Sequence, residues 1–266
     1  MPNLIETWLD LPAPGVFGVL AALYLTSGVL IAVVAFGSGP APRLQKFDGV
    51  VAPFFGAVSV LFALLTGFLA SDISDRNRQA TRAIQAEVSE LRNVFTLSVA
   101  SASDMKQIRA DWAAYVKAVV TDEWKAMTEG ESAPSASAAY DEMLREVSAP
   151  KIATESGAAV HTALLSAAVR VGTARSDRLS LASDNTSVLK WSMVLMLGVM
   201  TQISLALVHL TKRNAQMAAL TVFSVAAVLS LGLIALQEHP FAGPVRLDAA
   251  PLQELLKLQG PEAAAK

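Results

Sequence analysis

Histidines, cysteines and hydroxyl residues are the side chains that most often carry chemistry, and their spacing here matches no known reaction. The three histidines, His161, His209 and His239, lie far apart, and no HExxH pattern occurs. The absence of cysteine excludes thiolate metal sites, disulfides and cysteine nucleophiles. The phosphate loops GxGxxG and GxxxxGKS/T and the nucleophile pattern GxSxG are also missing. We therefore expect no catalytic residue, no cofactor and no metal site.

Two close pairs of carboxylates are the remaining candidates for acid–base chemistry. Glu87 lies near Glu90, and Asp122 is adjacent to Glu123. Each pair belongs to a segment that is rich in charge and typical of a solvated helix face, where such pairs are routine. We interpret both pairs as ordinary surface charges, and the sequence gives no reason to expect an enzyme.

The composition is that of a protein divided between lipid and water. Of the 266 residues, 53% are hydrophobic and 17% are charged, which is too apolar for an ordinary soluble domain of this length. The apolar residues gather at the two ends of the chain, whereas residues 71–187 have the charge density of a soluble helical protein. The net charge is -2 and no unbroken basic run occurs, so nucleic acid is not expected as a partner.

Four segments are long and apolar enough to cross a bilayer, which takes about 20 residues. They are 14–36, 50–70, 188–210 and 216–236, and Lys190 is their one charged residue. The prediction is an all-α polytopic membrane protein with four transmembrane helices and a helical extramembrane domain between the second and third. It divides the chain into a first hairpin at 1–70, the domain at 71–187, a second hairpin at 188–237 and a tail at 238–266.

A stripe of small residues follows one face of the second span at alternating spacings of three and four. Its members are Gly56, Ser59, Ala63, Thr66 and Ala70, and the same register continues through Glu87 to Val94. One helix from about 50 to 97 is therefore predicted to leave the bilayer and form a wall of the domain. Within the membrane, the stripe fits either close helix packing or the lining of a narrow ion pathway.

Polar residues at and within the membrane allow two interpretations each. Gln202 lies inside the third span, where it either bonds a neighbouring helix or contacts an ion or substrate. Basic residues gather where the domain meets the bilayer, among them Arg76, Arg78, Arg82, Arg175 and Arg178. They fit snorkelling and salt bridges, or a weakly positive vestibule if an oligomer repeats them around an axis.

The central domain and the tail are predicted to be helical. An apolar stripe from Ser103, a suitable N-cap, indicates one helix, and further helices are expected at about 138–147 and 152–182. In the tail, Asp248 can cap a short helix whose apolar edge, Leu252, Leu255 and Leu256, needs a surface to bury against. We expect this helix to dock on the domain or on a neighbouring subunit.

Four segments of the sequence resemble the bestrophin-like family of bacterial membrane proteins. They are 86–95, 115–127, 174–179 and 239–252. The resemblance implies a homo-oligomer, a pentamer by analogy, that conducts anions through a pore lined by the second span. The alternative is a non-conducting scaffold or sensor whose domain binds a partner. The calcium clasp and the neck residues of bestrophin channels have no convincing match here.

The resemblance and the four spans imply a place in the bacterial inner membrane, with lipid and small inorganic ions as partners. Basic residues in the two short loops favour the cytoplasm for those loops and the periplasm for the central domain, whereas the arginines of the domain beside the bilayer favour the opposite orientation.

Overall fold

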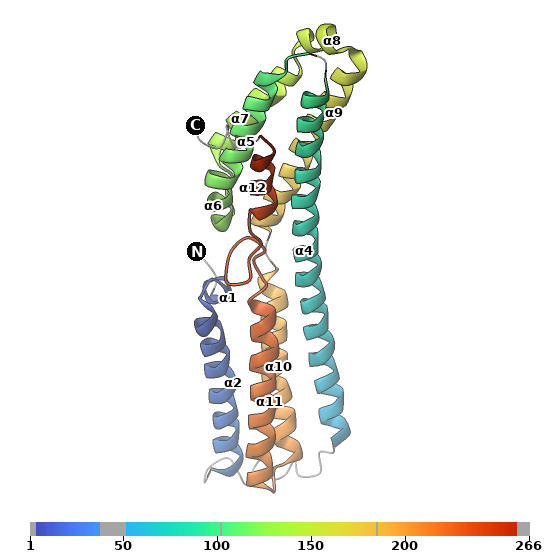
Figure 1. The fold of residues 1–266 in the computed structure, drawn as a ribbon. Helices are drawn as coiled ribbons and strands as arrows, with labels where there is room; N and C mark the ends of the chain where they lie inside the picture. Colours follow the sequence, from blue (N-terminus) through green and yellow to red (C-terminus); the bar gives the residue numbers. More distant parts are fainter. Residues whose placement is uncertain (1–3, 38–51, 102, 185, 260–266) are drawn as a thin grey trace. The chain divides into compact units, whose positions relative to one another are not determined.

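The computed structural model describes residues 4–37, 52–101, 103–184 and 186–259, which are helical and contain no strand. The helices are labelled in Figure 1. They are α1 (Leu4–Leu9), α2 (Ala13–Phe36), α4 (Ala52–Ala100), α5 (Lys106–Ala118), α6 (Trp124–Ala126), α7 (Pro134–Val147), α8 (Pro150–Ser156), α9 (Ala158–Ser183), α10 (Val188–Val208), α11 (Arg213–Ala235) and α12 (Ala250–Leu256). A π-helical segment, Val119–Glu123, joins α5 to α6.

Four of these helices, α2, α4, α10 and α11, have the length and composition to cross a membrane, as predicted. Their ends lie within a few residues of the predicted ones, although the start expected near residue 50 falls outside the described residues. The second span does not stop at the membrane boundary, because α4 continues without a break to Ala100. At 1.5 Å per residue, its 49 residues extend roughly 74 Å, more than twice the hydrocarbon thickness of about 30 Å.

The chain forms two compact units, and α4 contributes to both. The membrane unit comprises Met1–Asp75, Asn185–Glu238 and Gly243–Val245, and the extramembrane unit comprises Arg76–Asp184, His239–Ala242 and Arg246–Lys266. The C-terminal tail, which was expected as a segment of its own, therefore belongs largely to the extramembrane unit.

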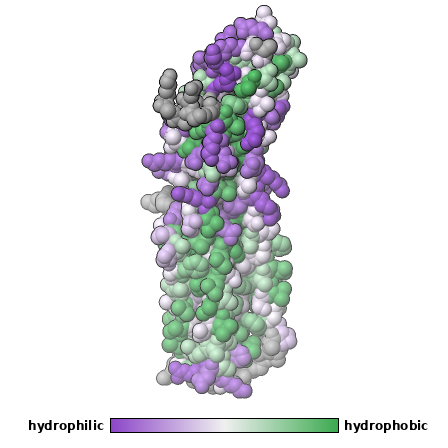
Figure 2. Space-filling model, viewed as in Figure 1, coloured by the Kyte–Doolittle hydropathy of each residue, from purple (hydrophilic) through white to green (hydrophobic). Residues whose placement is uncertain are grey.

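In the membrane unit, α2, α10 and α11 lie side by side and enclose an apolar core (Figure 1). Leu20, Tyr24 and Trp191 are among its most deeply buried members. The short helix α1, which the sequence pattern did not reveal, covers one end with Trp8 packed edge-on against Trp191 at 5.2 Å between ring centroids. The outer surface of the spanning helices is hydrophobic, as expected for contact with lipid (Figure 2).

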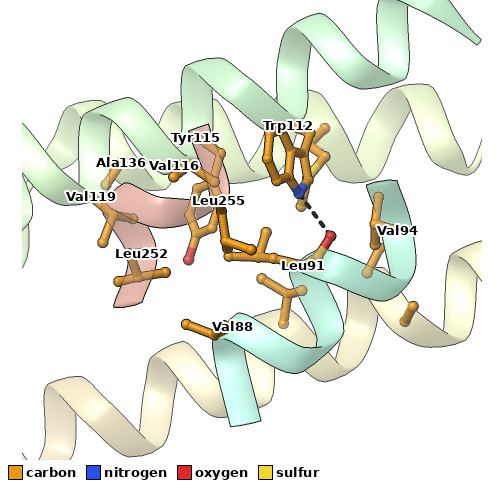
Figure 3. Packing of buried hydrophobic residues seen from close by; sticks show 14 of the residues in the cluster. Val88, Leu91, Val94, Trp112, Tyr115, Val116, Val119, Ala136, Leu252 and Leu255 are labelled. Atoms are coloured by element: carbon orange, nitrogen blue, oxygen red, sulfur yellow. Dashed lines mark hydrogen bonds between the residues drawn. The ribbon is translucent and has the colours of Figure 1, made fainter. Parts of the chain in front are cut away.

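The core of the extramembrane unit forms between the second half of α4, α5, α7, α9 and α12. Trp112 lies at its centre and donates a hydrogen bond from Nε1 to the Leu91 carbonyl at 2.8 Å (Figure 3). Leu252 and Leu255 of α12 are fully buried in the same core (Figure 3). The tail helix is therefore docked on the domain as predicted. Asp248 accepts a hydrogen bond from the Ala250 N–H at 2.9 Å, but the N-cap residue is Ala249, so Asp248 is not the cap that the sequence suggested.

Three helix boundaries of the domain differ from the predicted ones. Helix α5 begins at Lys106 with Met105 as its N-cap residue, so Ser103 is not the cap that was expected. Asp104 accepts a hydrogen bond from the Lys106 N–H at 3.1 Å. Helix α7 begins at Pro134, which suits the first turn because proline lacks the N–H that a helix start leaves unused. The expected 152–182 helix is two helices, because Gly157 adopts a φ of 85°, which ends α8.

Candidate functional site

The small-residue stripe of α4 changes character along the helix. Beyond the membrane boundary it is the core face of the extramembrane unit, where Ala80, Ile84 and Leu91 are buried. Within the span it borders the face that packs on the rest of the membrane unit. Ser59 and Thr66 are half-buried there, whereas Ala63 is exposed. Gly56 and Ala70, the other two predicted members, are also half-buried.

The rest of the α4 span is left bare by its own chain. Of the most apolar 18-residue stretch in each span, 6% is buried in α4, against 28% to 44% in the other three. Large apolar side chains on this helix, among them Val60, Leu64 and Phe68, are 52% to 68% exposed. Phe62, Leu69 and Ile73 pack α4 against the membrane unit, Phe62 through Phe223 at 5.6 Å between ring centroids. Most of the span must therefore face lipid, another subunit or a pathway.

Gln202 is the centre of a buried polar cluster that joins α2, α10 and α11. Its amide nitrogen donates to the Tyr24 carbonyl at 2.8 Å and to Ser224 Oγ at 2.9 Å. Its amide oxygen accepts a hydrogen bond from Ser27 Oγ at 2.6 Å. Every group of this amide that can form a strong hydrogen bond is therefore engaged by a neighbouring helix. Of the two interpretations of Gln202, this geometry favours interhelical bonding over ion contact.

Glycine permits the close approach of α10 to α2 beside this cluster. A Cβ atom on Gly198 would lie 2.1 Å from the hydroxyl oxygen of Tyr24 and 2.8 Å from its ring. A Cβ on Gly28 would meet Gln202 Nε2 at 3.6 Å, an ordinary contact. Of these two glycines in the same helix bundle, only Gly198 is required for the helices to pack this closely.

A buried network of four charges holds the extramembrane unit together. Arg178 of α9 is fully buried and donates from Nε to Glu87 Oε2 at 2.6 Å and from Nη2 to Glu123 Oε1 at 2.8 Å. Arg175, one turn earlier, binds Glu123 through both Nε and Nη2. Tyr115 completes the set by donating its hydroxyl to Glu87 Oε1 at 2.5 Å. Two carboxylates face two guanidinium groups, so the network is neutral.

Local structure around the network explains how it is satisfied. The π-helical segment Val119–Glu123 carries the Glu123 carboxylate at its end, and Arg178 lies over the Trp124 ring at 5.5 Å from its centroid. Arg178 Nη1 contacts the sulfur of Met127 at 2.7 Å. Burial raises the pKa of the Tyr115 hydroxyl well above its ordinary value, and the neighbouring Glu87 carboxylate adds to the shift, so this tyrosine stays protonated.

The network corrects two expectations from the sequence. Glu87 and Glu123 are not routine surface charges, because both are buried and paired with arginine. Arg175 and Arg178 cannot supply a vestibule, because Glu123 and Glu87 neutralise their charges inside the domain. Glu87 did carry a signal, since it lies in the register of an otherwise apolar stripe. The remaining predicted pair partners, Glu90 and Asp122, lie at the domain surface.

The other three predicted vestibule arginines lie near the start of the extramembrane part of α4. Arg76 is buried and donates from Nη1 to the Asp184 carbonyl at 3.3 Å. Arg78 and Arg82 are exposed. Only these two of the five can present charge to solution.

The described part of the chain contains no group of three histidine, aspartate or glutamate residues that could hold a metal ion. His161, His209 and His239 are each half-buried, on α9, after α10 and after α11 respectively.

Comparison with known proteins identifies the family. The model of the bestrophin-like domain matches residues 21–252. The chain belongs to the bestrophin-like family. Structures similar to this bestrophin-like chain include a variant of a membrane protein (TM-score 0.69, 12% identity), which covers 92% of this chain and 99% of its own. A variant of a bacterial bestrophin homolog from Klebsiella pneumoniae has a TM-score of 0.66 at 12% identity and the same coverage. At this identity the likeness establishes the fold alone. No curated protein sequence matches this bestrophin-like chain.

Proposed function

We propose that this bestrophin-like protein is an oligomeric ion channel, selective for anions, in the bacterial inner membrane. The observation that carries the proposal is the bare span of α4. Three of the four spans pack against one another, whereas α4 offers most of its membrane surface to something outside its own chain. A pathway formed by several copies of one helix needs such a surface on each copy.

The small-residue stripe is the part of α4 that we propose faces the pathway. Gly56, Ser59, Ala63, Thr66 and Ala70 allow copies of the helix to approach one axis and leave room for a narrow path. Five copies, by analogy with the family, would surround one axis.

Anion preference is proposed on the exposed basic residues that follow the span. Arg78 and Arg82 lie on the first turns of α4 beyond the apolar stretch, and repetition around an axis would make a positive ring. Arg175 and Arg178 take no part in this ring. From the charges of the two short loops we further propose that the extramembrane unit lies in the periplasm.

One observation favours a second candidate function, a non-conducting scaffold. Ser59 and Thr66 are half-buried on the side of α4 that packs against its own chain, so the stripe could serve helix packing alone. The buried charge network would then give a rigid domain for binding a partner.

Thiol accessibility separates the two functions, and the absence of cysteine makes each introduced thiol unique. Ala63→Cys places a thiol on the exposed edge of the stripe, and Leu61→Cys is the matched exposed position on the other side of the helix. In protein reconstituted into liposomes, a charged, membrane-impermeant thiol reagent should modify Ala63→Cys and reduce chloride flux. Leu61→Cys should stay unmodified, because a lipid-facing thiol does not ionise.

The outcomes are distinct. Modification of Ala63→Cys with altered flux supports the channel and this face of α4. Absence of chloride flux from folded, assembled protein across a range of pH and calcium would refute the channel and favour the scaffold. Modification of Leu61→Cys alone would keep the channel and move the pathway to the other face.

A further inference from the structure

A groove of about 370 Å³ lies between α4 and α10 in the membrane unit. Its apolar lining is formed by Leu65, Phe68, Leu69, Met193 and Val194. Phe68 and Met193 are 68% and 51% exposed, so the apolar surface is open and not covered by the chain itself. An apolar groove at bilayer depth fits hydrocarbon.

One end of the same groove is lined by charged side chains. Lys190 and Asp72 form an ion pair across its end at 2.5 Å, and both side chains are about half exposed. Asp75 and Ser71 also line this end. The apolar residues of the α4 span stop at Ala70, so the charged end lies where hydrocarbon gives way to headgroups. The groove is thus amphipathic in the same direction as a phospholipid.

The charged end favours one kind of headgroup. Lys190 has three N–H donors and uses one in its hydrogen bond to Asp72, so it can also donate to a phosphate. Asp72 accepts from Lys190 through Oδ2 and can accept a further hydrogen bond through its other oxygen. The charged end thus offers N–H donors and a carboxylate acceptor side by side, which favours a ligand that has a phosphate as well as an ammonium.

The groove also lies on the lipid-facing side of α4 if the stripe faces a pathway. Ala63 and Leu65 are two positions apart, so they point about 160° away from each other at 100° per residue. The same holds for Ala70 and Asp72. The stripe and the groove therefore occupy opposite sides of α4. Only the conclusion that the groove faces lipid rests on the proposed function.

We infer that the groove between α4 and α10 is a binding site for a phospholipid with a primary amine, such as phosphatidylethanolamine. The phosphate accepts from Lys190, the ammonium donates to Asp72, and one acyl chain lies along Leu65 and Met193. Phosphatidylglycerol offers no cation to Asp72. Phosphatidylcholine has a cation, but its quaternary nitrogen has no hydrogen to donate.

Native mass spectrometry of the full-length, lipid-stripped protein in an equimolar mixture of these three lipids tests the inference. The protein should retain about tenfold more phosphatidylethanolamine than either of the other two, the ratio expected for one charge-assisted hydrogen bond. Asp72→Asn should abolish that preference. Met193→Trp fills the groove and should lower retention, whereas Met196→Trp, on an exposed position outside the groove, should not.

Other outcomes overturn the site. Equal or stronger retention of phosphatidylglycerol by the wild-type protein would show that the charged end does not select an amine. A cross-link between subunits through Met193→Cys, without retained lipid, would show that a second copy fills the groove. Lipid retention is read without ion flux, so a non-conducting protein that keeps phosphatidylethanolamine would refute the channel and support this inference.

Discussion

Replacing Arg178 by methionine should strongly destabilise the extramembrane unit. Methionine approximates the length of the side chain and fits the apolar surroundings, but it removes both of the ion pairs that Arg178 makes. Glu123 keeps Arg175, whereas Glu87 keeps only the Tyr115 hydroxyl in a site without solvent. The change therefore isolates the effect of one uncompensated buried carboxylate.

The size of the effect follows from burial. Breaking a fully buried ion pair by removing one partner costs about 3 to 5 kcal/mol, mostly through the charge that is left behind. For a chain of this size, each kcal/mol lowers the melting temperature by about 2 to 4 °C, so a decrease of about 6 to 20 °C is expected. Adding Glu87→Gln to Arg178→Met removes the stranded charge and should restore more than half of the loss.

Differential scanning fluorimetry of the full-length protein in detergent measures these shifts, and Trp124 beside Arg178 contributes to the signal. Arg145→Met is the matched control, because Arg145 pairs with Glu142 on the surface of α7, where both side chains are more than half exposed. Arg145→Met should have the same melting temperature as the wild type. If Arg178→Met also melted within about 2 °C of the wild type, the buried network would not be holding the domain together.

Three further changes test other parts of the fold. Gly198→Ala should cost about 1 to 3 kcal/mol by driving a methyl group into Tyr24, whereas Gly28→Ala should be tolerated, as thermal melting of the two variants will show. Leu252→Ala should cost about 2 to 5 kcal/mol because it opens a cavity in the domain core, measurable as increased proteolysis of the domain. Burial raises the pKa of the Asp111 carboxyl, so the folded chain binds its proton more tightly than the unfolded chain does. The stability of the fold should therefore fall as pH rises from about 4, the ordinary pKa of aspartate, through the raised pKa. Asp111→Asn should flatten this part of a profile of melting temperature against pH.

The four spans were predictable because hydropathy is a property of each segment alone, and α4 was predictable as one helix because its stripe keeps register. The charge network was not, since whether Glu87 is exposed depends on Arg178, which lies 91 positions later. The place of Glu87 in an otherwise apolar stripe was the one local indication that its carboxylate is buried. The break at Gly157 was missed because an isolated glycine is compatible with either a continuous helix or a helix end. Which face of α4 meets a pathway depends on neighbouring chains that no single sequence places.

The distance along the chain between the partners of the charge network also sets the order of events during synthesis. Glu87 leaves the ribosome 91 residues before Arg178, which takes roughly 5 to 18 s at about 5 to 20 residues per second. Throughout that interval the core face of α4 has no α9 to bind, and its carboxylate must stay hydrated. The first two spans are complete well before then, so membrane insertion of the first hairpin precedes folding of the domain. A chaperone that shields this exposed helix during those seconds would act on the nascent chain and not on the finished protein.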